Sequence, residues 1–272
     1  MSLITISHST GSGGHQIAQM VADSLKLELF DDLRLEQEAS KLGISNDDIR
    51  GMNEKAPGFF DQILSRKPEM YLEFMEALIY EVARKGTGVI IGHGSQMLLR
   101  DFDCALHVFI QAPETNRIDV FKNRNNLSRE AAEKLIRKSD RERAGFFRFA
   151  FQLERNNPEL YDLVINTGKM SSATAARLIV ETAISEELKE CGLGVLDAMD
   201  RLSMEGKIQA ALHKNNLSPK MLHFEVIETG VVQIRGISSA RQLKERIISV
   251  VQSVPGVKEV KSDISVVDRA YY

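Results

Sequence analysis

The N-terminal segment constrains the fold more than any other part of the chain. An apolar run at residues 3–6 leads into a glycine-rich stretch at residues 10–14. Apolar residues then recur at helical spacing: Ile17, Val21 and Leu25. This order predicts a strand, a tight loop and an amphipathic helix. The amide groups of such a loop, together with the positive end of the helix dipole, create a binding site for an anion.

The loop lacks two groups of a complete P-loop. In the motif G-x-x-x-x-G-K-[ST], the lysine reaches the β- and γ-phosphates and the hydroxyl holds Mg²⁺. When Gly13 is aligned with its second glycine, Gly14 stands at the lysine, His15 at the hydroxyl and His8 at the first glycine. The dinucleotide motif G-x-G-x-x-G also fails, because its last glycine is replaced by Gln16. Two interpretations stay open: an anion-binding loop without these groups, or a turn that binds nothing.

Composition limits the class of protein. A chain of 272 residues with 43% hydrophobic content can form two domains with real cores. A net charge of −3 argues against general nucleic-acid binding. No export signal is visible, and the apolar runs are far shorter than the roughly 20 residues that cross a membrane. Cys104 and Cys191 lack metal-ligand spacing and fit reduced thiols. We therefore expect a cytoplasmic protein without a transmembrane segment.

Strands and helices alternate from the loop to about residue 190. Further strands are predicted by apolar runs at residues 27–30, 88–92, 105–110 and 163–166. Helices are predicted at residues 35–42, 69–85 and 172–190. A long helix is also predicted after Ser128 and a short one after Ser45, because each serine can act as an N-cap. This alternation indicates a doubly wound α/β fold with a parallel sheet. Ligands bind such sheets at the carboxyl ends of the strands, where the glycine-rich loop lies.

The pattern changes after the Gly-Leu-Gly segment at residues 192–194. A helix at residues 203–214 is followed by two strands, 222–228 and 231–235, which Thr229-Gly230 joins in a hairpin. A second helix, capped by Ser238 or Ser239, and a strand at residues 257–267 complete a small α+β unit with the order αββαβ. We therefore expect two domains, at residues 1–192 and 200–272.

Short motifs occur in a fixed order along residues 3–190. Besides the loop, they are Phe30-Asp31, Ile90-Ile91-Gly92-His93-Gly94, Gln111-Ala112-Pro113 with Arg117, Asp140-Arg141-Glu142-Arg143-Ala144, and Tyr161-Asp162-Leu163-Val164-Ile165-Asn166-Thr167. Together they resemble the cytidylate kinase-like family, a branch of the P-loop nucleoside monophosphate kinases. Family members commonly share the Gly-Gly at the position of the Walker lysine, so the absence of the lysine is a trait of the branch.

The resemblance implies a nucleotide-binding protein that moves the γ-phosphoryl group of ATP, with Mg²⁺, to a pyrimidine nucleoside monophosphate such as CMP. The residues that would contact the donor phosphates are Thr10, Gly11, Ser12, Gly13, Gly14, His15 and Gln16. The residues that would face the acceptor are Asp31, Gly92, His93, Gly94 and Arg117. The catalytic residues, on a lid helix after Ser128, would be Arg137, Asp140, Arg141 and Arg143.

The lid helix and the histidines each have an alternative explanation. Arginines can stabilise a transferring phosphoryl group in place of a lysine, but a solvated helix with i,i+4 pairs such as Glu133–Arg137 would also be basic. The family tends to carry arginine where His15 and His93 stand, and histidine is mostly neutral at pH 7. We therefore expect slow turnover or none. A three-histidine metal site with His8 is the weaker alternative to a polar lining, and we predict no metal ligands.

Residues 203–268 resemble a BON domain, the transport-associated module of bacterial envelope and phospholipid-binding proteins. The resemblance rests on Gly230-Val231-Val232-Gln233-Ile234-Arg235-Gly236 and on Val254-Pro255-Gly256-Val257-Lys258-Glu259-Val260. The unit is net positive, which permits contact with anionic phospholipid; a protein contact or homo-oligomerisation is the alternative. The combination suggests a bacterial protein. It is expected to be a kinase or, alternatively, an inactive nucleotide sensor that signals through the BON domain.

Overall fold

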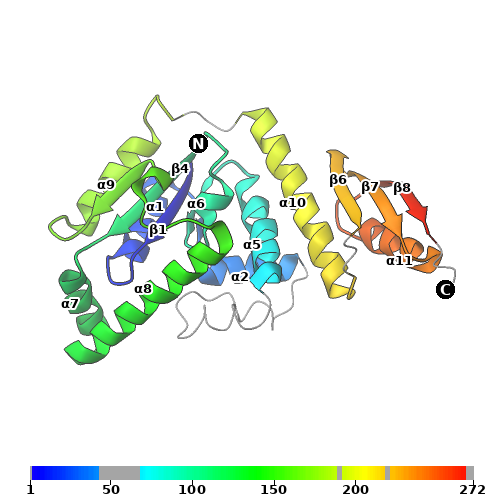
Figure 1. The fold of residues 1–272 in the computed structure, drawn as a ribbon. Coiled ribbons are helices and arrows are strands. Elements are labelled where there is room, and N and C mark those ends of the chain that lie inside the picture. The colour runs from blue at the N-terminus through cyan, green and yellow to red at the C-terminus, as the bar shows by residue number, and fades with distance from the viewer. Residues whose placement is uncertain (1, 43–67, 189–191, 218–220, 268–272) are drawn as a thin grey trace.

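The computed structural model describes residues 2–42, 68–188, 192–217 and 221–267. Its larger sheet has five parallel strands in the order β2-β3-β1-β4-β5 (Figure 1). The strands are β1 (Leu3–His8), β2 (Leu29–Phe30), β3 (Gly88–Ile91), β4 (Ala105–Gln111) and β5 (Leu163–Asn166). This sheet confirms the predicted α/β fold class. The central position of β1 places the loop that follows it between the ends of β3 and β4.

Helices cover both faces of this sheet. They are α1 (Gly14–Leu25), α2 (Asp32–Lys41), α5 (Pro68–Ala83), α6 (Ser95–Leu98), α7 (Glu114–Asn125), α8 (Arg129–Phe151) and α9 (Ser172–Ala183). On one face Ile4 and Ile6 pack with Ile17 of α1 and Ile179 of α9. On the other face Leu3 packs with α2 and α5. Both faces are buried, which explains why the strands read as unbroken apolar runs.

The smaller unit follows the predicted αββαβ order. It contains α10 (Leu193–Lys214), β6 (Leu222–Glu228), β7 (Val231–Ser238), α11 (Arg241–Gln252) and β8 (Glu259–Val266). The strands β6 and β7 form the expected antiparallel hairpin at Gly230, which has a φ of 84°. The strand β8 lies parallel to β7. One face of this sheet buries its side chains against α10 and α11 in a separate core.

Several element boundaries differ from the prediction. The helix α10 begins at Leu193 and not at residue 203, so residues 193–199 form its first turns. The helix α9 ends at Ala183 and not near residue 190. The N-cap of α11 is Ala240, and the Ser238 hydroxyl instead donates to the Ala240 carbonyl at 2.9 Å. The helix predicted after Ser45 lies outside the described residues.

Two further findings concern the redox state of Cys104 and the predicted absence of a transmembrane segment. Cys104 is disulfide-bonded, so the expectation of a reduced thiol at this position is not met. Over the ranges that the structure describes, no helix has both the length and the apolar character needed to cross a membrane.

Candidate functional site

The loop between β1 and α1 follows the path that its glycines allow. Gly11 and Gly13 have φ angles of 85° and 84°, a left-handed conformation that favours glycine. A Cβ atom on Gly11 would lie 2.6 Å from the Arg117 carbonyl oxygen, so a side chain does not fit there. Ser12 fixes the loop further, because its hydroxyl donates to the Ile110 carbonyl at 3.1 Å. The amide groups that begin α1 therefore face the carboxyl ends of β1 and β4.

His8 fills the space beside Gly14. A Cβ atom on Gly14 would lie 2.4 Å from both Cβ and Cγ of His8, far closer than nonbonded carbon atoms approach. In a complete P-loop the first position is glycine and the seventh is lysine. Here the side chain is at the first position and the glycine is at the seventh. The His8 side chain thus occupies space that a side chain at position 14 would need, and the glycine at position 14 leaves room for it.

His8 also contacts His15. The ring nitrogens His8 Nε2 and His15 Nδ1 lie 3.1 Å apart, and His8 Nδ1 donates to the Ser9 carbonyl at 3.2 Å. With its proton on Nδ1, neutral His8 accepts a hydrogen bond from His15. Burial, with nearby Arg143, His15 and Arg155, holds the pKa of His8 well below its ordinary value. His8 therefore stays neutral and adds no charge to the loop.

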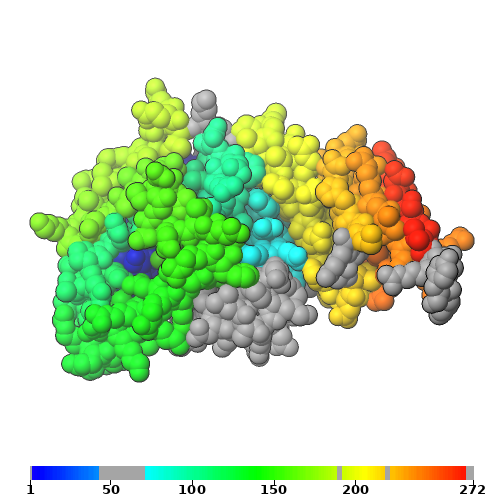
Figure 2. Space-filling model, viewed as in Figure 1, coloured from blue at the N-terminus to red at the C-terminus, as the bar shows by residue number. Residues whose placement is uncertain are grey.

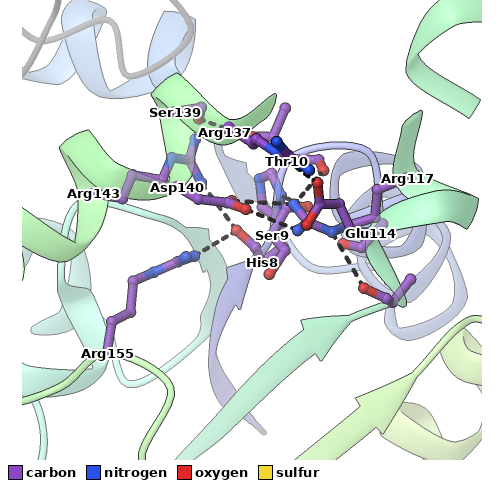
Figure 3. Close-up of polar contacts among 12 residues, drawn as sticks. His8, Ser9, Thr10, Glu114, Arg117, Arg137, Ser139, Asp140, Arg143 and Arg155 are labelled. Atoms are coloured by element: carbon purple, nitrogen blue, oxygen red, sulfur yellow. Dashed lines mark hydrogen bonds and ion pairs between the residues drawn. The ribbon is translucent and has the colours of Figure 1, made fainter. Parts of the chain in front are cut away.

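Two arginines bring positive charge to the end of β1. Arg143 is a buried residue of α8, and its Nη1 donates to the His8 carbonyl at 2.9 Å. Arg155, in the segment after α8, donates to the same carbonyl oxygen (Figure 3). The guanidinium carbon of Arg155 lies 5.3 Å from the centre of the Phe109 ring, which fixes its position further. Two planar cationic groups therefore meet beside the loop.

A clamp joins α7 and α8 to the loop. Arg117 of α7 forms two hydrogen bonds with the Asp140 carboxylate of α8, at 3.1 and 2.7 Å, and donates to the Thr10 carbonyl at 3.2 Å (Figure 3). The hydroxyls of Thr10 and Ser139 lie 2.8 Å apart. In the space-filling view, the dark blue N-terminal residues are visible only through a small opening between green segments (Figure 2). The helix α8 is therefore docked on the loop.

The other two predicted lid arginines lie on the surface. Arg137 is 58% exposed and pairs with Glu114 and Glu133, each at 2.7 Å. The i,i+4 alternative for this helix thus applies to Arg137. Arg141 is exposed. Among the predicted lid residues, Arg143 bonds to the His8 carbonyl beside the loop and Asp140 bonds to Arg117 of the clamp.

A small cavity lies next to the arginines. Its volume of about 20 Å³ suits a single water molecule. The residues that line it are Ser7, Gly92, His93, Gly94, Gln96, Arg143, Phe146, Phe147 and Arg155. The turn at residues 92–94 has positive φ at all three positions, including 57° at the non-glycine His93. Predicted acceptor residues and a predicted lid arginine therefore meet at one cavity.

His93 is held by two buried partners. Its Nε2 lies 2.9 Å from Asp32 Oδ1, and its Nδ1 lies 3.2 Å from the Tyr71 hydroxyl. Both ring nitrogens of His93 thus bond to protein side chains. An arginine at this position would instead extend its guanidinium group to a phosphate. Asp31 instead caps α2, where its Oδ1 accepts from the Arg34 amide at 3.0 Å. The carboxylate at the site is that of the neighbouring Asp32.

Several residues at this site carry no recognisable signal in the sequence. Arg155, Asp32, Tyr71 and Gln96 belong to no motif with recognisable spacing. For Asp32, the one available signal was a second carboxylate directly after the predicted strand end. Within the described ranges, no group of three or more His, Cys, Asp or Glu side chains is arranged to hold a metal ion. His8 contacts His15, whereas His93 contacts Asp32 and Tyr71.

Known proteins resemble parts of this chain. A uronate isomerase from Corynebacterium glutamicum is 33% identical over 95 residues, which is 35% of this chain and 18% of that protein. The chain thus spans less than a fifth of that relative. A cytidylate kinase from Pyrobaculum islandicum is 25% identical over 182 residues, 66% of this chain and 92% of the kinase.

A solved structure of an uncharacterized protein from Eubacterium ventriosum has a TM-score of 0.50 at 20% identity, covering 68% of this chain and all of that one. It supports the fold alone. The model of the BON domain matches residues 202–268. The model of the cytidylate kinase-like family matches residues 3–169, more than half of the chain. The chain therefore belongs to the cytidylate kinase-like family and carries a BON domain after the kinase-like part.

Proposed function

We propose that the N-terminal unit is a slow phosphotransferase of the nucleoside monophosphate kinase type. ATP is the donor and a pyrimidine nucleoside monophosphate such as CMP is the acceptor. The observation that carries the proposal is the meeting of the Arg143 and Arg155 guanidinium groups at the His8 carbonyl, beside an anion-binding loop. The similarity to a protein named cytidylate kinase supports the choice of acceptor.

The proposed chemistry depends on these two arginines. Phosphoryl transfer needs reactants held in line and positive charge on the equatorial oxygens of the transferring group. The space of the usual lysine is filled by His8, which is neutral. A guanidinium group has five N–H donors, so Arg143 and Arg155 can each keep the His8 carbonyl and also bind a phosphate oxygen. They supply charge from the lid side of the loop.

Binding of a nucleotide requires the lid to open. Pockets for small molecules usually enclose about 300–1,000 Å³, whereas the cavity has about 20 Å³. The contacts that hold α8 on the loop are the Arg117–Asp140 pair and the Thr10–Ser139 bond. We therefore expect α8 to open, the nucleotides to enter, and α8 to close again over them.

The loop residues fit phosphate better than they fit Mg²⁺. Loop amides and arginines suit phosphate oxygens. His15 replaces the hydroxyl that holds Mg²⁺ in a complete P-loop, and both oxygens of Asp140 are bonded to Arg117. We therefore assign no Mg²⁺ ligand to the protein, and the ion would be held by nucleotide phosphates and water.

The test is an assay of ADP formation from ATP and CMP with Mg²⁺ on the full chain. We expect a kcat below about 1 s⁻¹, the lower end of the kinase range. Arg143→Gln and Arg155→Gln should each lower kcat roughly 100-fold, the effect of removing one transition-state donor. Arg129→Gln is the control, because Arg129 lies on the same helix but pairs with Asp119 at the surface. Unchanged turnover in both variants would contradict the proposal.

A nucleotide sensor is the second candidate, favoured by the filled lysine space. A sensor would show melting-temperature shifts with nucleotides but no ADP formation. It would pass its state through the BON domain to a cytoplasmic partner, either a protein or an anionic phospholipid surface. A screen that finds no nucleotide with a melting shift at millimolar concentration would exclude both candidates.

A further inference from the structure

The helix α10 belongs to two cores. Its residues Met199 and Ala210 are buried in the core that contains α5 and the large sheet. Ile208 and Leu212, on another side of the same helix, are buried in the core of the BON sheet. Figure 1 shows α10, in yellow, between α5 and the three-stranded sheet. A single continuous helix therefore connects the two units through its side chains as well as through the chain.

Small residues bring α10 close to α5. The residues of α10 on this side recur at spacings of four and three: Met199, Ser203, Gly206, Ala210 and His213. A Cβ atom on Gly206 would lie 2.5 Å from the Cβ of Ala77. The two helices touch without long, flexible side chains between them at this point. Such close packing transmits displacement, because a packed interface does not deform smoothly.

Polar contacts fix the register along the same line. Glu81 accepts a hydrogen bond from Ser203 at 2.6 Å and pairs with Lys207 at 2.7 Å. At one end of the interface Arg84 pairs with Asp200 at 2.9 Å. At the other end His213 Nε2 lies 2.5 Å from the Glu73 carboxylate. The helices are thus antiparallel and held along the length of α5.

The N-terminal part of α5 contacts two residues that line the cavity, His93 and Phe146. Tyr71 lies two residues before Glu73, and its hydroxyl bonds to His93, which lines the cavity. Its ring also packs edge-on against Phe146 of the lid helix, with centroids 5.5 Å apart. A single helix therefore contacts the candidate acceptor site, the lid and α10.

The C-terminal part of α10 is bonded to the BON sheet. The Glu205 carboxylate accepts from the Val226 amide of β6 at 3.1 Å. Leu212 and Ile208 pack with Phe224 and Val232 of the sheet. The contacts from the cavity to β6 thus run from His93 to Tyr71 of α5, from α5 to α10, and from Glu205 of α10 to the Val226 amide.

We propose that α5 and α10 couple the occupancy of the cavity beside His93 to the BON sheet. The proposal rests on the proposed function insofar as the occupant is a nucleotide. When the lid opens and a nucleotide enters, the Tyr71–His93 and Tyr71–Phe146 contacts change, and α5 carries α10 with it. Because coupling is reciprocal, a partner bound to the BON sheet changes nucleotide affinity by the same factor.

Two alanine variants of α10 form a matched pair for the test. Gly206→Ala places a methyl group against Ala77 and separates the helices, whereas Gly194→Ala meets nothing within 4 Å. Both changes replace a glycine of the same helix with alanine and differ in the neighbour that the new methyl group meets, so loss of coupling in Gly206→Ala alone reports the α5–α10 contact. Calorimetric unfolding of the full chain is measured without ligand. We expect one transition for the wild type and Gly194→Ala, and two for Gly206→Ala.

Hydrogen exchange then tests the nucleotide part. With Mg²⁺ and with ATP and CMP each at about 10 times its Kd, amides of β6 and β7 should exchange up to about 100-fold more slowly in the wild type and in Gly194→Ala. Gly206→Ala should bind the nucleotides but lose this protection. Protection confined to the kinase-like unit of the wild type would overturn the inference and leave the proposed function intact. Two separate transitions in the wild-type calorimetry would overturn it without any ligand.

Discussion

At the scale of single residues, His8 and Gly14 depend on each other. Gly14→Lys alone must displace the His8 side chain, so we expect it to lower the melting temperature and abolish any nucleotide-dependent shift. His8→Gly with Gly14→Lys recreates the first glycine and the lysine of a complete P-loop, and should recover both. The measurement is a double-mutant cycle of unfolding free energies, with an expected favourable coupling above about 1 kcal/mol.

The control for this cycle is a lysine placed where it meets no neighbour. A Cβ atom on Gly145 in α8 has nothing within 4 Å. The effect of Gly145→Lys should therefore be the same with His8 or with glycine at position 8. If Gly14→Lys also had the same effect in both backgrounds, the steric exchange between these positions would be disproved.

His8 should also make stability depend on pH. Burial and nearby Arg143 lower its folded pKa, so only the unfolded chain binds a proton at His8 as pH falls below about 6.5. The free energy of unfolding should then decrease with falling pH, by up to about 1.4 kcal/mol per pH unit. His8→Asn should remove this part of the slope between pH 7 and 5. An unchanged slope in His8→Asn would contradict this assignment.

At the scale of elements, the sequence predicted what depends on local pattern. The runs at β3, β4 and β5 and the Ser128 cap of α8, which accepts from the Ala131 amide at 3.1 Å, follow from apolar spacing and capping chemistry. The helices α6 and α7 were not predicted, because α6 spans only four residues and α7 carries a weak apolar stripe. The start of α10 was missed because Gly192 and Gly194 weaken the helical signal there.

The candidate site was predictable only where it follows a motif. The loop glycines and the turn at residues 92–94 carry their conformational signal in the sequence. Arg155 and Tyr71 reach the site from elements far away in the chain, and no spacing relates them to the loop. Tertiary contacts also decide which arginine of α8 points inward. Arg143 donates to the His8 carbonyl, whereas Arg137 donates to Glu114 at the surface.

The clamp between α7 and α8 gives a prediction at this scale. Asp140→Asn removes the charge that holds Arg117 and should lower the free energy of unfolding by about 1–3 kcal/mol, since Arg117 is buried. Amides of the loop after β1 should exchange faster in this variant. The matched control is Asp119→Asn, which breaks an exposed pair with Arg129 and should cost less than about 1 kcal/mol. Equal losses in the two variants would contradict a clamp.

At the scale of the whole molecule, Glu81 is one of the side chains that join the two units. Glu81 of α5 lies half-buried against α10, where it bonds to Ser203 and Lys207. Although burial acts to raise its pKa, hydrogen bonds from Lys207 and Ser203, with the charges of Lys207 and Arg84, lower the pKa overall. A carboxyl group with a lowered folded pKa stabilises the fold above its unfolded pKa, and this stabilisation is lost as pH falls through the folded pKa.

Glu81→Gln should therefore destabilise both units together at pH 7, by about 1–3 kcal/mol, because the half-buried Lys207 then lacks its carboxylate partner. The difference in melting temperature between the wild type and Glu81→Gln should shrink as pH is lowered from 5 toward 3, because the wild-type carboxylate is then protonated. Glu245→Gln is the control, since Glu245 forms an exposed i,i+4 pair with Arg241 within α11. Thermal unfolding over this pH range measures all three proteins. A constant difference at every pH would show that the charge of Glu81 does not hold α10 on α5.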